Sequence, residues 1–279
     1  MLGQRIAALE RPPRRWIQRV WGVPEIDTRQ KWTALWPELA RLPERGVRLL
    51  DVGCGAGRWT LELASRRPDW QLSGVDRDAD AIRLAENGRE HLGLVNASFT
   101  VADFLEFRPA APFDVILSVA SAHYLVAERK GSDLFGRFRG WLRPGGHLLL
   151  LGPRSRGEAP FSPSLPRPPW HEVFSARELA ELCRDSGLEV DGLSGRVGRL
   201  GTLAKQLSWV SNGYPRLVAA GLYALEWILA LIDARLTFNG RSTVFWLLLA
   251  RRPEVVSGVS LRPSEKHTLP SPGTDPPSR

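Results

Sequence analysis

Residues Val47–Ala64, VRLLDVGCGAGRWTLELA, decide the fold of this chain. The first six residues are largely apolar and predict a buried strand of a parallel sheet. Glycines follow at Gly53, Gly55 and Gly57, and a helical pattern begins at Arg58. Glycine tolerates positive φ and lets a ligand lie against bare backbone, while a helix N-terminus presents free N–H groups. The segment therefore predicts a nucleotide-type binding corner at the carboxyl end of the sheet.

The spacing of the glycines argues against a dinucleotide. A dinucleotide fingerprint is G-x-G-x-x-G, but here Arg58 occupies the last position and Gly57 comes one residue early. Asp51 stands just before the turn, where its charge would repel a pyrophosphate and attract a cationic amine. An alternative is a glycine turn that binds no ligand.

The stretch Asp51–Gly57, DVGCGAG, closely resembles the first motif of the class I S-adenosylmethionine-dependent methyltransferases, of the small-molecule, type 11-like kind. The resemblance implies a Rossmann-like α/β fold, S-adenosylmethionine as cofactor, S-adenosylhomocysteine as product, and no metal. It also implies that the loop holds the methionine part of the cofactor. The loop residues expected to bind it are Asp51, Gly53, Cys54, Gly55 and Gly57.

Composition sets wider bounds. The chain has 279 residues and 43% hydrophobic content, enough for one large domain. The formal net charge is +8, but no dense Lys/Arg run is present, so we favour ordinary basic composition over a nucleic-acid site. Cys54 and Cys183 suggest neither a disulfide framework nor a metal site. We expect a cytoplasmic protein.

The ribose is expected to meet the second strand, predicted over residues 70–76. Asp76 ends this strand, and an acidic side chain there is able to accept hydrogen bonds from both ribose hydroxyls. Its alternative role is that of a solvated turn aspartate. Arg77 follows, and its stem is a weaker candidate for contact with the adenine. Asp78 is expected to cap the next helix, predicted over residues 78–91.

The adenine is expected to meet the residues after the third strand, predicted over 98–101. In the resembled family an acidic residue at this place binds the adenine amino group, which assigns the role to Asp103. An alternative is that Asp103 only caps a helix. The neighbours that the resemblance places beside the ring are Ala102 and Phe104.

The fourth strand, predicted over residues 113–120, is apolar enough to be buried on both faces. The resemblance implies that its end, from Ser118 onward, faces the cofactor and the transferable methyl. His123 is the best candidate for a catalytic base because its unperturbed pKa is near 6.5, and Tyr124 is a weaker one. The alternative for His123 is a wall of the cofactor pocket.

Residues 118–121 read SVAS, where many N-methyltransferases carry an Asn/Asp-Pro-Pro-Tyr motif. This difference argues against methylation of DNA bases or of glutamine. It favours O- or C-methylation of a small molecule, such as a quinone, lipid or sugar intermediate. One alternative is an RNA methyltransferase. Others are a cofactor-binding protein without catalysis and an NAD-dependent oxidoreductase.

Three segments surround the predicted seven-stranded, mostly parallel sheet with helices on both faces. Residues 1–43 are a tryptophan-rich N-terminal cap, which either packs on the domain or forms a lid, with Lys31 and Trp32 as contacts. Residues 44–251 are the methyltransferase domain, and residues 252–279 are a tail expected to be disordered. The later strands are predicted over residues 147–151, 188–193 and 243–251.

Residues 195–241 form a predicted helical insertion that holds an apolar helix, 217–236. Glu226 and Asp233 are seven residues apart and so share one face of this helix. The apolar run is shorter than the ~20 residues of a membrane span. Three interpretations stay open: a roof over the substrate pocket, a homodimer interface, or peripheral membrane contact.

Overall fold

The computed structural model describes residues 26–122, 132–153, 176–196, 200, 201, 203, 204, 207, 216–235 and 245–254. The catalytic candidates His123 and Tyr124, and the predicted disordered tail beyond residue 254, lie outside these residues.

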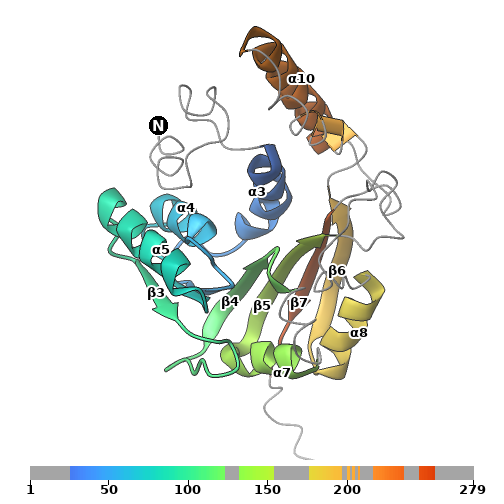
Figure 1. Cartoon of the computed structure of the whole chain (residues 1–279). Coiled ribbons are helices and arrows are strands. Elements are labelled where there is room, and N and C mark those ends of the chain that lie inside the picture. The colour runs from blue at the N-terminus through green and yellow to red at the C-terminus, as the bar shows by residue number, and fades with distance from the viewer. Residues whose placement is uncertain are drawn as a thin grey trace, which may run out of the picture.

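A single sheet organises the described chain (Figure 1). Its seven strands have the order β3-β2-β1-β4-β5-β7-β6. β7 runs antiparallel to both of its neighbours, and the other pairs are parallel. The predicted Rossmann-like, mostly parallel sheet is therefore confirmed. The strands are β1 (Arg48–Val52), β2 (Gln71–Asp76), β3 (Ala97–Val101), β4 (Phe113–Val119), β5 (Leu142–Pro153), β6 (Glu189–Arg196) and β7 (Phe245–Arg251).

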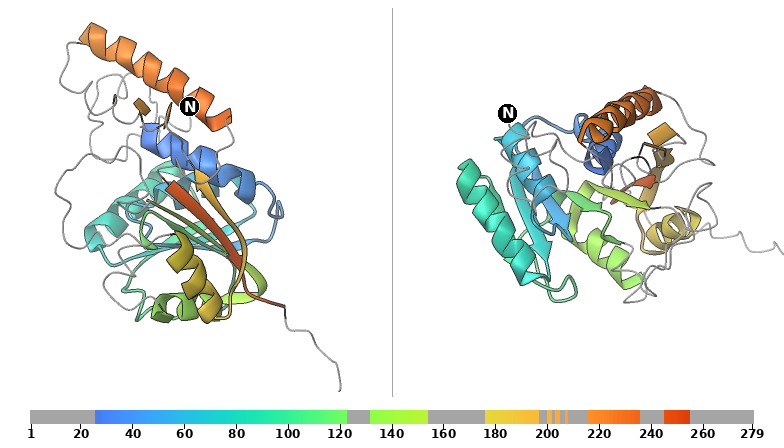
Figure 2. Two further views of the ribbon diagram at one scale, coloured as in Figure 1. Left: turned by 90° about the vertical axis from the view of Figure 1, so that its right-hand side faces the viewer. Right: turned by 45° about the horizontal axis from the view of Figure 1, so that its top comes forward.

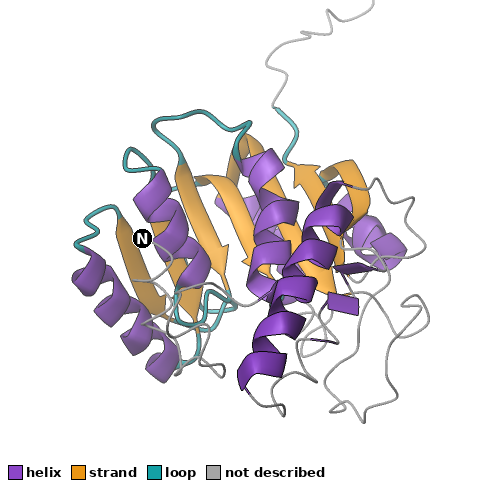
Figure 3. Ribbon diagram, turned by 90° about the horizontal axis from the view of Figure 1, so that it is seen from above, coloured by secondary structure: helices purple, strands orange, loops and turns teal. Residues whose placement is uncertain are grey.

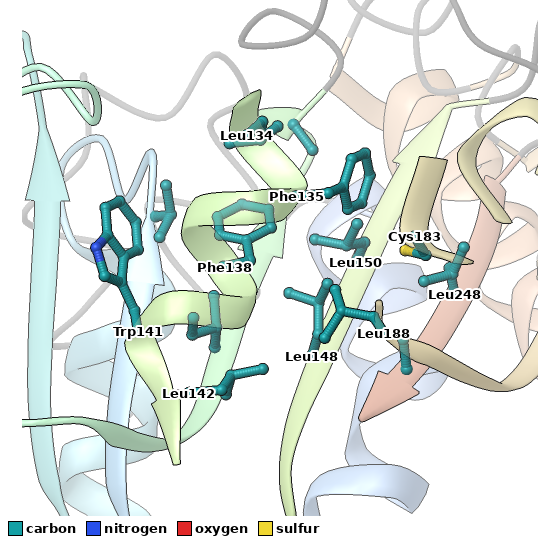
Figure 4. Packing of buried hydrophobic residues seen from close by; sticks show 14 of the residues in the cluster. Leu134, Phe135, Phe138, Trp141, Leu142, Leu148, Leu150, Cys183, Leu188 and Leu248 are labelled. Atoms are coloured by element: carbon teal, nitrogen blue, oxygen red, sulfur yellow. The ribbon is translucent and has the colours of Figure 1, made fainter. Parts of the chain in front are cut away.

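Helices cover both faces of the sheet, as predicted. One face carries a buried cluster to which α7 and α8 contribute, including Phe135, Phe138 and Cys183 (Figure 4). The other carries a cluster to which α3 and α4 contribute, including Leu35 and Leu63. The helices are α3 (Ile26–Leu39), α4 (Arg58–Arg66), α5 (Ala79–Leu92), α7 (Ser132–Trp141), α8 (Ala176–Asp185) and α10 (Arg216–Arg235).

The start of the fifth strand differs from expectation, because the Pro-Gly-Gly residues lie within the strand and not before it. The sequence predicts this strand over residues 147–151, but β5 runs without a break from Leu142 to Pro153. Phe113 pairs with Leu142, and Val115 already pairs with His147, so the register shifts between them. The extra residues are absorbed as an irregularity within the strand, which is how a sheet accommodates an insertion without ending.

The N-terminal cap and the insertion meet at the carboxyl edge of the sheet. β6 runs parallel to β1 and β4, because β7 is antiparallel to both β5 and β6, so the insertion leaves β6 at the edge where the glycine turn lies. The guanidinium carbon of Arg29 in α3 lies 3.6 Å from the ring centroid of Trp227 in α10. The amide Nε2 of Gln30 donates to the carbonyl oxygen of Gly201 at 2.9 Å. Figures 2 and 3 show α3 and α10 side by side at this edge.

Candidate functional site

The glycine turn between β1 and α4 is held by main-chain hydrogen bonds. The N–H groups of Gly53 and Cys54 both donate to the carbonyl oxygen of Val75, at 2.8 and 3.1 Å. Gly53 has φ +72°, and a Cβ there would lie 2.5 Å from the Cβ of Ser121. Glycine is therefore required at this position by both conformation and space.

Gly55 faces open space instead. Its φ is +53°, and a Cβ built on it meets nothing within 4 Å. Its N–H donates to Oδ2 of Asp76 at 2.8 Å, and Oδ1 of Asp76 accepts from the N–H of Asp78 at 3.0 Å. The end of β2 thus fixes the turn. A carboxylate has about four acceptor positions, so Asp76 keeps capacity for ribose hydroxyls while it holds the loop.

Asp51, the last but one residue of β1, is a buried carboxylate with one unmet acceptor. Its exposed fraction is 1%, and Oδ2 accepts from the hydroxyl of Thr60 at 2.8 Å. Oδ1 is buried and has no hydrogen-bond partner in the described part of the chain. Burial raises the pKa of Asp51 to about 7, the Thr60 hydrogen bond opposes this rise, and the charge of Asp76 adds to it.

These features fit the amino-acid part of S-adenosylmethionine. A buried carboxylate oxygen that lacks a donor is costly, and an ammonium group supplies both a donor and an opposite charge. The bare backbone at Gly55 leaves room beside it. Asp51 and Gly55 would then hold the methionine part, and Asp76 the ribose.

The thiol of Cys54 belongs to the packing of this corner. Cys54 is 5% exposed, and burial together with the charges of Asp51 and Asp76 raises its pKa well above the ordinary range. A Cβ on Gly74 would lie 2.9 Å from its sulfur, so the thiol fills the space above β2. Cys54 thus lies at the predicted site, but its sulfur is buried there.

The residues predicted for the adenine lie beside β2 but differ in exposure. The N–H of Ala102 donates to the carbonyl oxygen of Asp76 at 2.9 Å, which places it next to the residue predicted to bind the ribose. Oδ1 of Asp103 accepts from the N–H of Leu105 at 2.8 Å, so Asp103 caps a turn whatever else it binds. Phe104 is 6% exposed and packs in the core. Arg77 is exposed.

Ser118 is also turned into the protein. It is fully buried, and its hydroxyl lies 2.7 Å from that of Ser121. The Ser121 hydroxyl donates to the carbonyl oxygen of Val52 at 2.8 Å and so joins the end of β4 to the glycine turn. Between them, Ala120 has φ +56°, a left-handed conformation that is strained for alanine. Ala120 and Ser121 fall in the strand end that was expected to face the cofactor, but neither was named there as a site residue.

A second contact that the sequence analysis missed joins the cap to the glycine turn. Arg58, the first residue of α4, donates from its guanidinium to the hydroxyl of Thr28 in α3 at 2.7 Å. Burial lowers the pKa of Arg58 to about 10, and nearby Glu62 raises it in part. The signal for Arg58 was its presence in place of a third spaced glycine, but nothing in the sequence identified Thr28.

Trp32, named as a lid contact, packs on the domain. Its ring centroid lies 5.0 Å from that of Trp59 in α4 and 5.9 Å from that of Trp36. Trp32 and Trp36 therefore support the interpretation in which the cap packs on the domain.

Two further findings concern the rest of the described chain. Within it, no group of three or more His, Cys, Asp or Glu side chains is arranged to hold a metal ion. A cavity of about 430 Å³ lies at the amino end of β4 and β5, lined by Arg108, Arg143 and Arg252 among others. It is at the opposite edge of the sheet from the glycine turn and is not part of the site.

The family model described as a methyltransferase domain matches residues 43–188, which include the glycine turn and the described elements from β1 to α8. The chain therefore belongs to this family. Its fold and its glycine turn are those of a class I S-adenosylmethionine-dependent methyltransferase.

The curated relatives are methyltransferases that differ in acceptor, and the solved structures share the fold. The chain is 34% identical over 173 residues to the release factor glutamine methyltransferase of Salmonella typhimurium, covering 53% of this chain and 59% of that protein. It is 32% identical over 147 residues to the trans-aconitate 2-methyltransferase of Azoarcus sp., covering 52% and 55%. The structure of an O-methyltransferase from a trans-AT PKS multienzyme of Brevibacillus brevis, in complex with S-adenosyl-L-homocysteine, matches with a TM-score of 0.57 and 16% identity, covering 89% and 79%.

The chain spans less than two thirds of the length of the curated relatives it matches, from 29% to 59% among the first of them.

Proposed function

We propose that this protein transfers a methyl group from S-adenosylmethionine to an oxygen or carbon atom of a small-molecule acceptor. The observation that carries the cofactor part is the unmet Oδ1 of buried Asp51 beside the open backbone of Gly55. A diphosphate would be repelled at this place, whereas a methionine ammonium is attracted.

The cofactor supplies an electrophilic methyl whose leaving group is a neutral thioether, so departure needs no acid. The task of the protein is to hold the acceptor in line and, for a hydroxyl, to remove its proton. The rigid turn at Gly53, tied to β2 through Val75 and to β4 through Ser121, supports the positioning role. His123 comes four residues after the end of β4 in the sequence and remains the proposed base, with Tyr124 as the alternative.

Three observations favour a small acceptor. Residues 118–121 are SVAS rather than Asn/Asp-Pro-Pro-Tyr, although relatives named as glutamine methyltransferases share the fold. The cap formed by α3 and the insertion also stands at the carboxyl edge of the sheet, where a covering layer suits a small substrate better than a protein or RNA. The trans-aconitate relative is named for a small acceptor.

Titration calorimetry with S-adenosylhomocysteine and, separately, with NAD tests the cofactor. We expect binding of the first and none of the second, and a loss of about tenfold or more for Asp51→Asn, because a charge-assisted hydrogen bond is removed. Asp185→Asn, at the exposed end of α8, is the matched control. Binding of NAD alone would exclude the proposal.

The acceptor is tested by transfer of labelled methyl to small-molecule, RNA and protein fractions of a cell extract. We expect label in the small-molecule fraction. Label confined to RNA would establish the nucleic-acid alternative, label confined to protein would establish a release-factor-like role, and binding without label in any fraction would favour the non-catalytic alternative.

A further inference from the structure

Helix α10 is amphipathic in the reverse of the usual sense. Its buried polar residues, Glu226 and Asp233, have exposed fractions of 0% and 5%. Its most exposed large side chains are aliphatic, with Leu225 at 43% and Ile228 at 53% exposed. Charged groups of a surface helix normally face solvent and aliphatic groups face the core. The exposed set is Leu225, Ile228, Leu231 and Ile232.

These four residues form one continuous face, because they recur at intervals of three and four along the helix. Among the described side chains of α10, those that are exposed are all apolar or glycine. Opposite them, Ala230 packs with Trp227, Leu229 and Ala204 of the insertion. The reversed pattern is therefore fixed by contacts with the rest of the molecule.

The face points away from the domain. Arg29 of α3 lies over Trp227, so α3 covers the other side of α10. Figures 1 and 2 show α10 as the outermost helix at this edge, with α3 between it and the strands. No helix in the described residues is long and apolar enough to cross a bilayer.

We propose that this face of α10, Leu225, Ile228, Leu231 and Ile232, docks the protein on an anionic lipid surface. We choose an anionic lipid surface because its negative charge complements the positive charge of the protein. The chain carries a formal net charge of +8, and α10 begins at Arg216 and ends at Arg235. Its two acidic residues are turned inward, so no described carboxylate of the helix faces the lipid headgroups.

A second copy of the chain is the less suitable occupant. A standard protein interface needs about 800 Å² from each partner, with a core of close-packed side chains. Four half-exposed aliphatic side chains along one helix supply only part of that area. They match the shallow burial of an interfacial helix, which inserts aliphatic groups by a few ångströms and keeps its basic ends at the headgroups.

Flotation of the full chain with vesicles of phosphatidylglycerol and phosphatidylcholine tests this proposal. We expect binding that weakens with added salt and is much lower on phosphatidylcholine alone. The paired change Ile228→Ser and Ile232→Ser should reduce binding about tenfold or more, because two aliphatic groups that the lipid would bury are lost without a change of charge. Ile228→Trp should increase it, since indole favours the interface.

The matched control is Val95→Ser, which removes a 96% exposed aliphatic residue before β3 and should leave flotation unchanged. Binding of S-adenosylhomocysteine by the serine variant reports that it is folded, and it also separates this proposal from the cofactor assignment. Equal flotation of wild type and serine variant would overturn the proposal. So would a dimer in light scattering that the serine change dissociates while flotation stays the same.

Discussion

The hydroxyl of Thr60 donates a 2.8 Å hydrogen bond to Oδ2 of Asp51, which joins the first turn of α4 to the end of β1. The second oxygen of Asp51 has no partner within the described chain. The corner is therefore built with a half-satisfied buried carboxylate, and a state of this kind lowers the stability of the protein without its ligand. Consequences for stability and for binding follow from it.

Stability without cofactor should fall as pH rises from about 4 to about 7. The pKa of Asp51 is 3.8 when unfolded and about 7 when folded, so the folded state binds more protons in this window. The whole effect is on the order of 4 kcal/mol. Asp51→Asn should remove most of the slope and raise the melting temperature at pH 8. Thermal unfolding at pH 5 and pH 8 measures this, and an unchanged slope in the variant would contradict it.

Affinity for S-adenosylhomocysteine should rise with pH until Asp51 is ionised. The ligand ammonium favours the charged carboxylate, whose pKa is about 7 in its absence. Below that pH we expect a gain of up to about tenfold per pH unit, and little change above it. Calorimetry in buffers of different ionisation enthalpy would detect the released proton. A flat profile in wild type, or the same profile in Asp51→Asn, would show that another group is responsible.

Changing two glycines of the turn to alanine should have different effects, one on fold stability and the other on cofactor affinity. Gly57→Ala places a Cβ 2.7 Å from Phe99 and 2.8 Å from Ala85, so it should destabilise the fold by about 2 kcal/mol or more. Gly55→Ala meets nothing and has only the cost of φ +53°, about 1–2 kcal/mol, yet its methyl enters the ligand space. We expect a folded Gly55→Ala protein that has lost cofactor affinity. Urea unfolding and calorimetry on both variants would separate these outcomes, and normal binding by Gly55→Ala would place the ligand elsewhere.

The predictable parts of this molecule are local in sequence. The strands and the glycine turn were found because apolar runs and glycine spacing report on neighbouring residues, and Asp78 caps α5 through its side chain as expected. The strand end at Asp76 was also identified, and the structure brings it to Gly55.

The parts that were not predicted depend on pairs far apart in the chain. Ser118 was expected at the cofactor, but it bonds Ser121, which in turn holds the carbonyl of Val52. The contact of Thr28 with Arg58 spans 30 residues, and that of Gln30 with Gly201 spans 171. No periodicity reports such pairs, because each partner alone resembles an ordinary polar residue.

Both cysteines should be inert in the native protein. Burial raises the pKa of Cys183 to about 12, and it also raises the pKa of Cys54. The thiolate is the reactive form, so a disulfide reagent at pH 8 should titrate neither thiol until denaturant is added, and then both. Reaction of one thiol in the folded protein would indicate that the surrounding part of the core opens. S-adenosylhomocysteine should suppress this reaction only if the reacting thiol is that of Cys54.

The link between cap and insertion should depend on Gln30. Its side chain is buried, its Nε2 donates to the carbonyl oxygen of Gly201, and its Oε1 has no partner within the described chain. Gln30→Leu removes this hydrogen bond between α3 and Gly201, so it should increase hydrogen exchange around residues 200–207 by several-fold while the strands stay protected. Gln71→Leu, at the exposed start of β2, is the control.

Because the glycine turn lies on the other side of α3, affinity for S-adenosylhomocysteine should change by less than about twofold in Gln30→Leu. Unchanged exchange at 200–207 would show that the packing of Arg29 on Trp227 suffices to hold the two segments together.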